Sequence, residues 1–183
     1  MLVLVLVAVW ALPALDGAVS REDLAEPGDV IQLDDVITFA PEPGWNVVSG
    51  ERQGSPGSGG RYAPAAAVSK DGVVLQIQTD TYDGTADGLL EQLRTTSGGL
   101  RGEAGYRVIG DPIDIATAAG DRGVAARFSG SSGNGLIGAF VFGDHGVRLV
   151  AVGPATTPPA VTEEVGAMIR SVAPVGTTSE ATS

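Results

Sequence analysis

The side chains that could do chemistry in this sequence are few and far apart. His145 is the only histidine, and it lies in the segment Gly143-Asp144-His145-Gly146, whose composition is typical of an exposed turn. A histidine general base needs a nucleophile within reach, and the sequence contains no G-x-S-x-G motif to supply one. We therefore predict that His145 has no catalytic role.

Three aspartates, Asp80, Asp83 and Asp87, lie close together before a predicted helix. Calcium prefers such oxygen ligands, but the spacing differs from that of an EF-hand loop. Asp83 and Asp87 also suit the start of a helix, where carboxylates cap N–H groups and complement the helix dipole. We predict this helix-start role, with calcium binding as the alternative.

A glycine-rich segment, Gly133-Asn134-Gly135-Leu136-Ile137-Gly138, matches the pattern G-x-G-x-x-G. A dinucleotide site needs this pattern between a strand and a helix, followed by an acidic residue about twenty positions later. Here the segment opens a predicted strand, and positions 156–159 contain no acidic residue. We interpret the segment as a loop.

The sequence contains no cysteine, which excludes disulfides, thiolate metal sites, thiol catalysis and the lipid-modified cysteine of a bacterial lipoprotein. One histidine and no cysteine leave too few ligands for a zinc site. We therefore predict no cofactor, no metal and no enzymatic activity.

Trp45 and Tyr62 are the aromatic residues with the clearest alternative roles. Trp45 follows a Pro-Gly turn, and its large ring would fill a core. The alternative is that both rings belong to a contact surface for a partner or glycan. We keep Trp45 and Tyr62 as candidate partner contacts.

The formal net charge of −11 argues against a nucleic-acid partner, because binding nucleic acid requires lysine and arginine to neutralise phosphates. The 27 glycines among 183 residues favour strands joined by tight turns over a helical bundle.

Residues 1–15, MLVLVLVAVWALPAL, are apolar and uncharged. Their length of roughly 22 Å as a helix is that of a signal-peptide core, although no basic segment precedes it. We interpret residues 1–15 as an uncleaved membrane anchor, with a polar linker at 16–29 and the rest of the chain on the extracytoplasmic side. The alternatives are a cleaved signal with a secreted product, and a buried strand of the domain.

The remaining patterns predict a single domain over residues 30–174 and a disordered tail at 175–183. A helix is expected at 85–96, and a second begins at Pro158 with Thr157 as its cap and ends before Pro174. Residues 50–61 have the composition of a flexible loop. Strands are expected at 30–33, 36–40, 45–48, 62–69, 73–79, 106–109, 113–116, 123–129, 136–142 and 147–152. This order predicts the α+β class, with an antiparallel sheet and two main helices packed on it.

The segment Ile37-Thr38-Phe39-Ala40-Pro41-Glu42-Pro43-Gly44-Trp45, and the late hairpin followed by a helix ending in Ile169-Arg170-Ser171-Val172, resemble the PsbP-like fold family. The similarity extends to its exported actinobacterial members, including the LpqN-type lipoproteins. It implies an α/β/α sandwich and a non-catalytic binding or assembly role. No ligand-binding residues of that family match this sequence, so none is transferred.

We therefore expect a membrane-tethered accessory domain that binds a protein or another component of the cell envelope. Two alternatives remain. One is an envelope hydrolase that uses carboxylates such as Asp111 and Asp114. The other is a carrier domain that holds an apolar lipid between a helix and the sheet.

Overall fold

The computed structural model describes residues 23–99, 107–130 and 133–176. The predicted anchor at 1–15, the first half of the linker at 16–29 and most of the tail at 175–183 lie outside these ranges.

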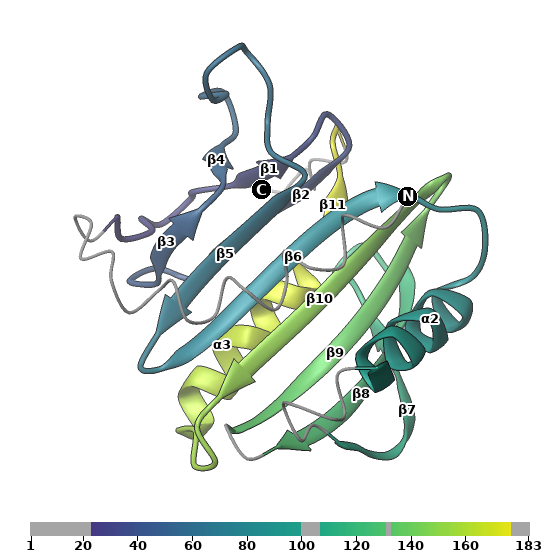
Figure 1. Cartoon of the computed structure of the whole chain (residues 1–183). Helices are drawn as coiled ribbons and strands as arrows, with labels where there is room; N and C mark the ends of the chain where they lie inside the picture. Colours follow the sequence, from purple (N-terminus) through teal and green to yellow (C-terminus); the bar gives the residue numbers. More distant parts are fainter. Residues whose placement is uncertain (1–22, 100–106, 131–132, 177–183) are drawn as a thin grey trace.

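A large antiparallel sheet is the centre of the described fold (Figure 1). From one edge to the other, its strands are β3 (Asn46–Ser49), β5 (Ala65–Lys70), β6 (Val73–Thr81), β10 (His145–Gly153), β9 (Gly133–Phe142), β8 (Arg122–Gly130) and β7 (Arg107–Ala116). The pairing of β6 with β10 joins the two halves of the chain, and β7 to β10 form the predicted antiparallel meander.

A second, smaller sheet was not predicted from the sequence. Its strands, in order, are β11 (Ala173–Pro174), β2 (Ile37–Phe39), β1 (Ile31–Leu33) and β4 (Glu51–Arg52). β4 lies in the segment predicted to be a flexible loop, and β11 in the segment predicted to end the last helix. Both consist of two residues and depend on partners distant in the sequence, so neither has a local pattern that would indicate it.

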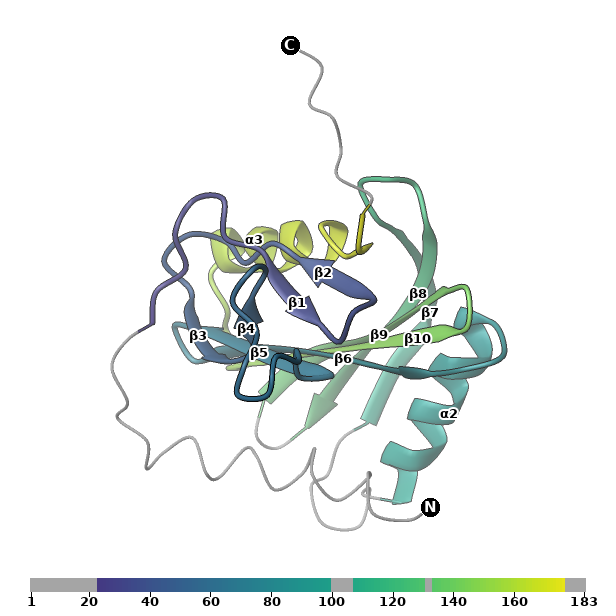
Figure 2. The same ribbon diagram turned by 90° about the horizontal axis from the view of Figure 1, so that it is seen from above.

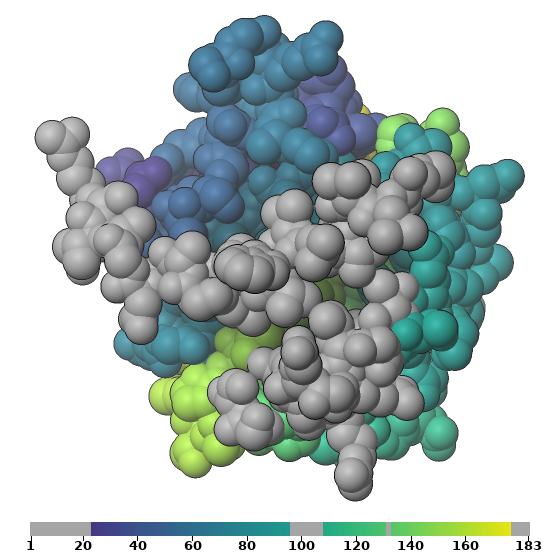
Figure 3. All heavy atoms as spheres, viewed as in Figure 1, coloured from purple at the N-terminus to yellow at the C-terminus, as the bar shows by residue number. Residues whose placement is uncertain are grey.

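Two helices in the described ranges cover opposite faces of the large sheet (Figure 2). α3 (Pro159–Arg170) lies on one face together with the small sheet. α2 (Ala86–Gly99) lies on the other face, against β8 and β9. Figure 3 shows this second face, with β3 to β5 and α2 on opposite sides of it. The architecture therefore has three layers, with the large sheet in the middle.

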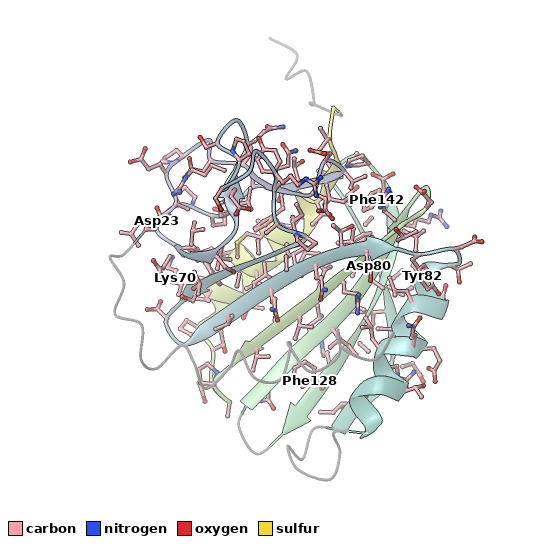
Figure 4. The ribbon with its side chains drawn as sticks, turned by 45° about the horizontal axis from the view of Figure 1, so that its top comes forward. Asp23, Lys70, Asp80, Tyr82, Phe128 and Phe142 are labelled. Carbon is pink, nitrogen blue, oxygen red and sulfur yellow. The ribbon has the colours of Figure 1, made fainter. Side chains whose placement is uncertain are left out.

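Each face of the large sheet carries its own apolar core. Leu75, Leu149 and Met168 belong to the core between the sheet, α3 and the small sheet, and all three are fully buried. Leu90 of α2 and Phe128 of β8 belong to the core on the opposite face (Figure 4). The alternation predicted for Val73 to Thr79 is confirmed, because every second residue of this strand is buried.

Two hairpin turns occur where the sequence predicts them. Asp34 and Asp71 both adopt positive φ angles, of 47° and 51°. Aspartate tolerates this left-handed conformation better than most residues. These turns connect β1 to β2 and β5 to β6.

The ends of α3 differ from the prediction. Pro158 occupies the cap position, and Thr157 donates its hydroxyl to the carbonyl of Pro154 at 3.2 Å instead of capping the helix. The helix ends at Arg170, since Ala173 and Pro174 pair with β2 as β11. Tertiary pairing therefore replaces the final turn that the apolar periodicity predicted.

β7 is one strand with an irregularity, where the sequence predicts two strands. Ile109 is opposite Arg127 and Ile113 is opposite Ala125, so β7 has two extra residues between these pairs. Gly110 has a φ of +71°, and Pro112 lacks an N–H donor. Both residues are compatible with a bulge in an edge strand, which β7 is.

Candidate functional site: a groove between α3 and the sheet

A groove lies between α3 and the part of the large sheet that ends in β7. Its volume is about 650 Å³, within the roughly 300–1,000 Å³ of small-molecule sites. In Figure 2, β7 and β8 rise from the plane of the sheet toward the C-terminal end of α3. There the N–H of Ala118 donates to the carbonyl of Arg170 at 2.7 Å. The curl of the sheet and the helix therefore form the two sides of the groove.

The strand register defines which side chains form the sheet side. Directly opposed residues on antiparallel strands point to the same face. Arg127 of β8 is opposite Leu136 of β9, which is opposite Ala151 of β10. Ala151 in turn is opposite Leu75, a residue of the core under α3. The side chains of Arg127 and Leu136 therefore project from the sheet face that α3 covers, and both line the groove.

The sheet side of the groove is mainly apolar. Ile115 and Leu136 line it, and their residues are only partly buried. Ile109 and Ile113 share this face by register and are 53% and 44% exposed. These two isoleucines extend the apolar surface along β7. Water therefore contacts an apolar strip that α3 does not cover.

The helix side has a notch at Gly166. A Cβ atom built at this position would meet only the Arg170 guanidinium, at 3.2 Å from Nη1. The guanidinium of Arg170 therefore lies back along α3, over Gly166. Thr162, Val165 and Ile169 also line this side.

Arg127 and Arg170 supply positive charge from both sides of the groove. Both residues are exposed, and neither forms an ion pair with a residue in the described ranges. By contrast, Arg52, Lys70 and Arg148 are engaged by aspartate or glutamate. The groove therefore combines an apolar floor with two available guanidinium groups.

Trp45 lies away from this groove, in the core. Its residue exposure is 0%, and its Nε1–H donates to Glu164 Oε2 at 2.7 Å. This placement agrees with the core interpretation of its sequence context. The buried ring offers no surface to a partner.

Tyr62 is half-buried in the loop before β5. Its hydroxyl accepts a hydrogen bond from the N–H of Gly54 at 2.9 Å. The ring thus braces the 50–61 segment. The structure does not bring Tyr62 together with Trp45, and neither lines the groove.

The ionisable candidates do not converge. His145 begins β10 and lies 3.2 Å from Asp144, measured from Nε2 to Oδ1. Asp80 lies at the end of β6, near Tyr82 (Figure 4). Its Oδ2 is 3.4 Å from Nη2 of Arg148. Within the described ranges, no three histidine or acidic side chains are grouped so that they could hold a metal ion.

Thr85 caps α2, because its hydroxyl oxygen accepts a hydrogen bond from the N–H of Gly88 at 3.2 Å. Asp83 and Asp87 are exposed at this helix end. Asp111 and Asp114, the candidates for a hydrolase, are exposed on the edge strand β7 and outside the groove.

The glycine-rich segment is part of β9, so its interpretation as a loop is wrong. The strand begins at Gly133 and leads into β10, with no helix between them. A Cβ atom at Gly135 would collide with the carbonyl oxygen of Ala151 and the ring of Phe128. The glycine here allows close packing of strand and ring, and the segment lacks the helix that a phosphate site needs.

The groove itself was not identified from the sequence. One signal was available, because the β8 segment places Arg127 two residues from Ala125, at an inward-facing position of a strand. A charge at such a position indicates an uncovered face. The curl of the strands decides which part of the sheet α3 leaves uncovered. The sequence pattern does not predict this curl.

Together, the large antiparallel sheet and the helices on its two faces define an α+β fold of the PsbP-like type. Similarity to a solved structure supports this assignment. The solution structure of cyanobacterial PsbP (CyanoP) from Synechocystis sp. PCC 6803 matches with a TM-score of 0.50, over 86% of this chain and 96% of that one. The sequences are 12% identical, so the similarity shows the fold alone.

No protein-family model matches the chain, and no curated protein matches its sequence. The predicted PsbP-like fold is confirmed, while the closer similarity to LpqN-type proteins has no support in these comparisons. In the part of the chain that the structure describes, neither helix is long and apolar enough to span a bilayer.

Proposed function

We propose that this chain is a non-catalytic binding domain whose ligand has an apolar part that occupies the groove between α3 and the large sheet. The observation that supports this proposal is the solvent-exposed apolar lining, to which both the helix and the strands contribute. Burying such surface gains roughly 25 cal/mol per Å². An apolar lipid held between a helix and the sheet, one of the alternatives left open by the sequence, would suit a groove with this lining.

Blocking the groove tests this function. Gly166→Leu would add a side chain at the notch, where the nearest obstacle is the flexible end of Arg170. The substitution also removes a glycine from a helix interior, which favours folding by roughly 1 kcal/mol. Ala160→Leu adds the same bulk to an exposed position of α3 outside the groove, and serves as the matched control.

The measurement is photolabelling of the full chain with a diazirine-bearing 1-decanol, followed by mapping of the labelled peptides. We expect labelling of α3 and of β8 to β9 in the unmodified protein and in Ala160→Leu, and loss of most of it in Gly166→Leu. Equal labelling of all three proteins would show that the groove is not the binding site.

We also propose that residues 1–15 tether this domain to the extracytoplasmic side of a cell membrane, where its ligand or partner belongs to the cell envelope. The uncharged apolar run supports this location. Membrane fractions washed with alkaline carbonate should retain the full chain, and deletion of residues 1–22 should release it. Recovery of the full chain from the cytosol would contradict the proposal.

A further inference from the structure

We infer that the groove binds a single acyl chain with a terminal carboxylate, and that Arg127 and Arg170 bind the carboxylate. This inference rests on the proposed function and adds the chemical class of the ligand. It depends on the two guanidinium groups, which line a mainly apolar groove and have no ion-pair partner among the described residues.

The charge of the whole chain makes these two arginines informative. The formal net charge is −11, with only 11 lysines and arginines in 183 residues. Among the described side chains, Arg61 and Arg122 are other arginines without an ion pair, and neither lines the groove. A neutral apolar ligand would not require positive charge at this place. A carboxylate would, since a guanidinium binds it through two parallel hydrogen bonds.

Arg127 is the more diagnostic of the two. Arg170 lies in the last turn of α3, where a positive side chain also complements the helix dipole. Arg127 has no such local reason. It is opposite Leu136 and Ile109, so it projects from a strand face that is apolar on both sides of it.

The dimensions of the groove favour one acyl chain over a polypeptide. Its volume of about 650 Å³ is that of a small-molecule site. A stable protein partner usually covers a much more extended surface, of about 800 Å² on each side. Leu136 and Ile169 would contact the acyl chain, and Ile109 and Ile113 extend the same apolar surface along β7.

The test compares the photoreactive decanol with the corresponding photoreactive decanoate, each competed by its unlabelled form to obtain an apparent Kd. On the full chain, the decanoate probe is used below its critical micelle concentration and the decanol probe below its solubility limit. A charge-assisted hydrogen bond contributes enough to change affinity about tenfold or more. We therefore expect decanoate to bind at least about tenfold more tightly than decanol at pH 7.

Arg127→Gln should bring the Kd for decanoate close to the Kd that the same variant has for decanol. Arg61→Gln removes the same charge from an exposed loop outside the groove, and should leave both values unchanged. Arg170→Gln should weaken decanoate binding in the same direction as Arg127→Gln.

The outcomes separate the two proposals. Groove labelling by both probes with equal affinity, or a preference for decanoate that survives Arg127→Gln, would overturn the carboxylate inference and leave the binding function intact. If neither probe labels the groove, both the carboxylate inference and the proposed binding function are overturned. Competition by a soluble oligoglutamate peptide as effective as that by decanoate would show that anion binding needs no acyl chain, and would also overturn the inference.

Discussion

Glu164 connects three parts of the structure through one carboxylate. Its Oε2 accepts the indole N–H of Trp45 at 2.7 Å, and both oxygens lie 2.9 Å from the Lys70 ammonium. Trp45 precedes β3, Lys70 ends β5 and Glu164 lies on α3. The hydrogen bond from Lys70 lowers the pKa of Glu164, burial opposes this shift, and the bond from Trp45 adds to it.

We predict that Glu164→Leu lowers the free energy of unfolding by about 1–3 kcal/mol, because it leaves the buried indole N–H of Trp45 without an acceptor. Glu164→Gln should cost less, since an amide oxygen can still accept from Trp45. Urea unfolding measures both effects. Glu163→Leu, at the exposed neighbouring position, is the control, and an equal loss in that variant would show that the indole bond is not the cause.

At the scale of elements, β9 depends on two glycines in different ways. Gly135 lies against the carbonyl oxygen of Ala151 and the ring of Phe128, so an added methyl group would meet backbone and a packed aromatic side chain. Gly138 lies nearest the flexible end of Leu149, with Cδ1 at 3.2 Å from a built Cβ. The same substitution should therefore have unequal effects within one strand.

We predict that Gly135→Ala lowers the free energy of unfolding by about 3 kcal/mol or more, at the upper end of overpacking effects. Gly138→Ala should cost clearly less, because the Leu149 side chain can move. Thermal and urea unfolding of the two variants test this order. A larger loss in Gly138→Ala would mean that β8, β9 and β10 pack differently around these positions.

At the scale of the whole molecule, the acidic chain uses several carboxylates to hold its parts together. The Arg52 guanidinium lowers the pKa of Asp23 through a hydrogen bond. The pKa of Asp29 is lowered first by the backbone N–H of Glu26 and then by Arg52. These bonds join the segment before β1 to β4. Burial and the neighbouring Asp35 raise the pKa of Asp34, which acts in the opposite direction.

We predict that stability falls in acid. A carboxyl whose pKa is lower in the folded state stabilises the fold above its unfolded pKa of about 4 and loses this contribution as the pH falls through the folded value. The pKa is lowered for three carboxyls, Asp23, Asp29 and Glu164, and raised for one, Asp34. The urea midpoint should therefore decrease between about pH 5 and pH 3. Arg52→Gln should flatten this dependence by removing a partner of two carboxyls, and an unchanged pH profile in that variant would contradict the explanation.

Local patterns predicted much of the fold because short-range chemistry controls it. The alternation in Val73 to Thr79 indicated one buried face, and the Asp71-Gly72 pair indicated the turn that follows β5. Both features depend on neighbours in the sequence. The two-residue strands β4 and β11 were missed because their hydrogen bonds go to residues far away in the chain.

The sequence by itself determined the α+β class, the order of the main strands and helices, the core role available to Trp45 and the lack of cysteine chemistry. Only the tertiary structure decided that Arg127 from β8 and Arg170 from α3 line one groove. The physical reason is that apolar periodicity and turn residues report the state of a few neighbouring residues. The face that a helix leaves uncovered depends instead on strand register, sheet curl and packing between distant segments.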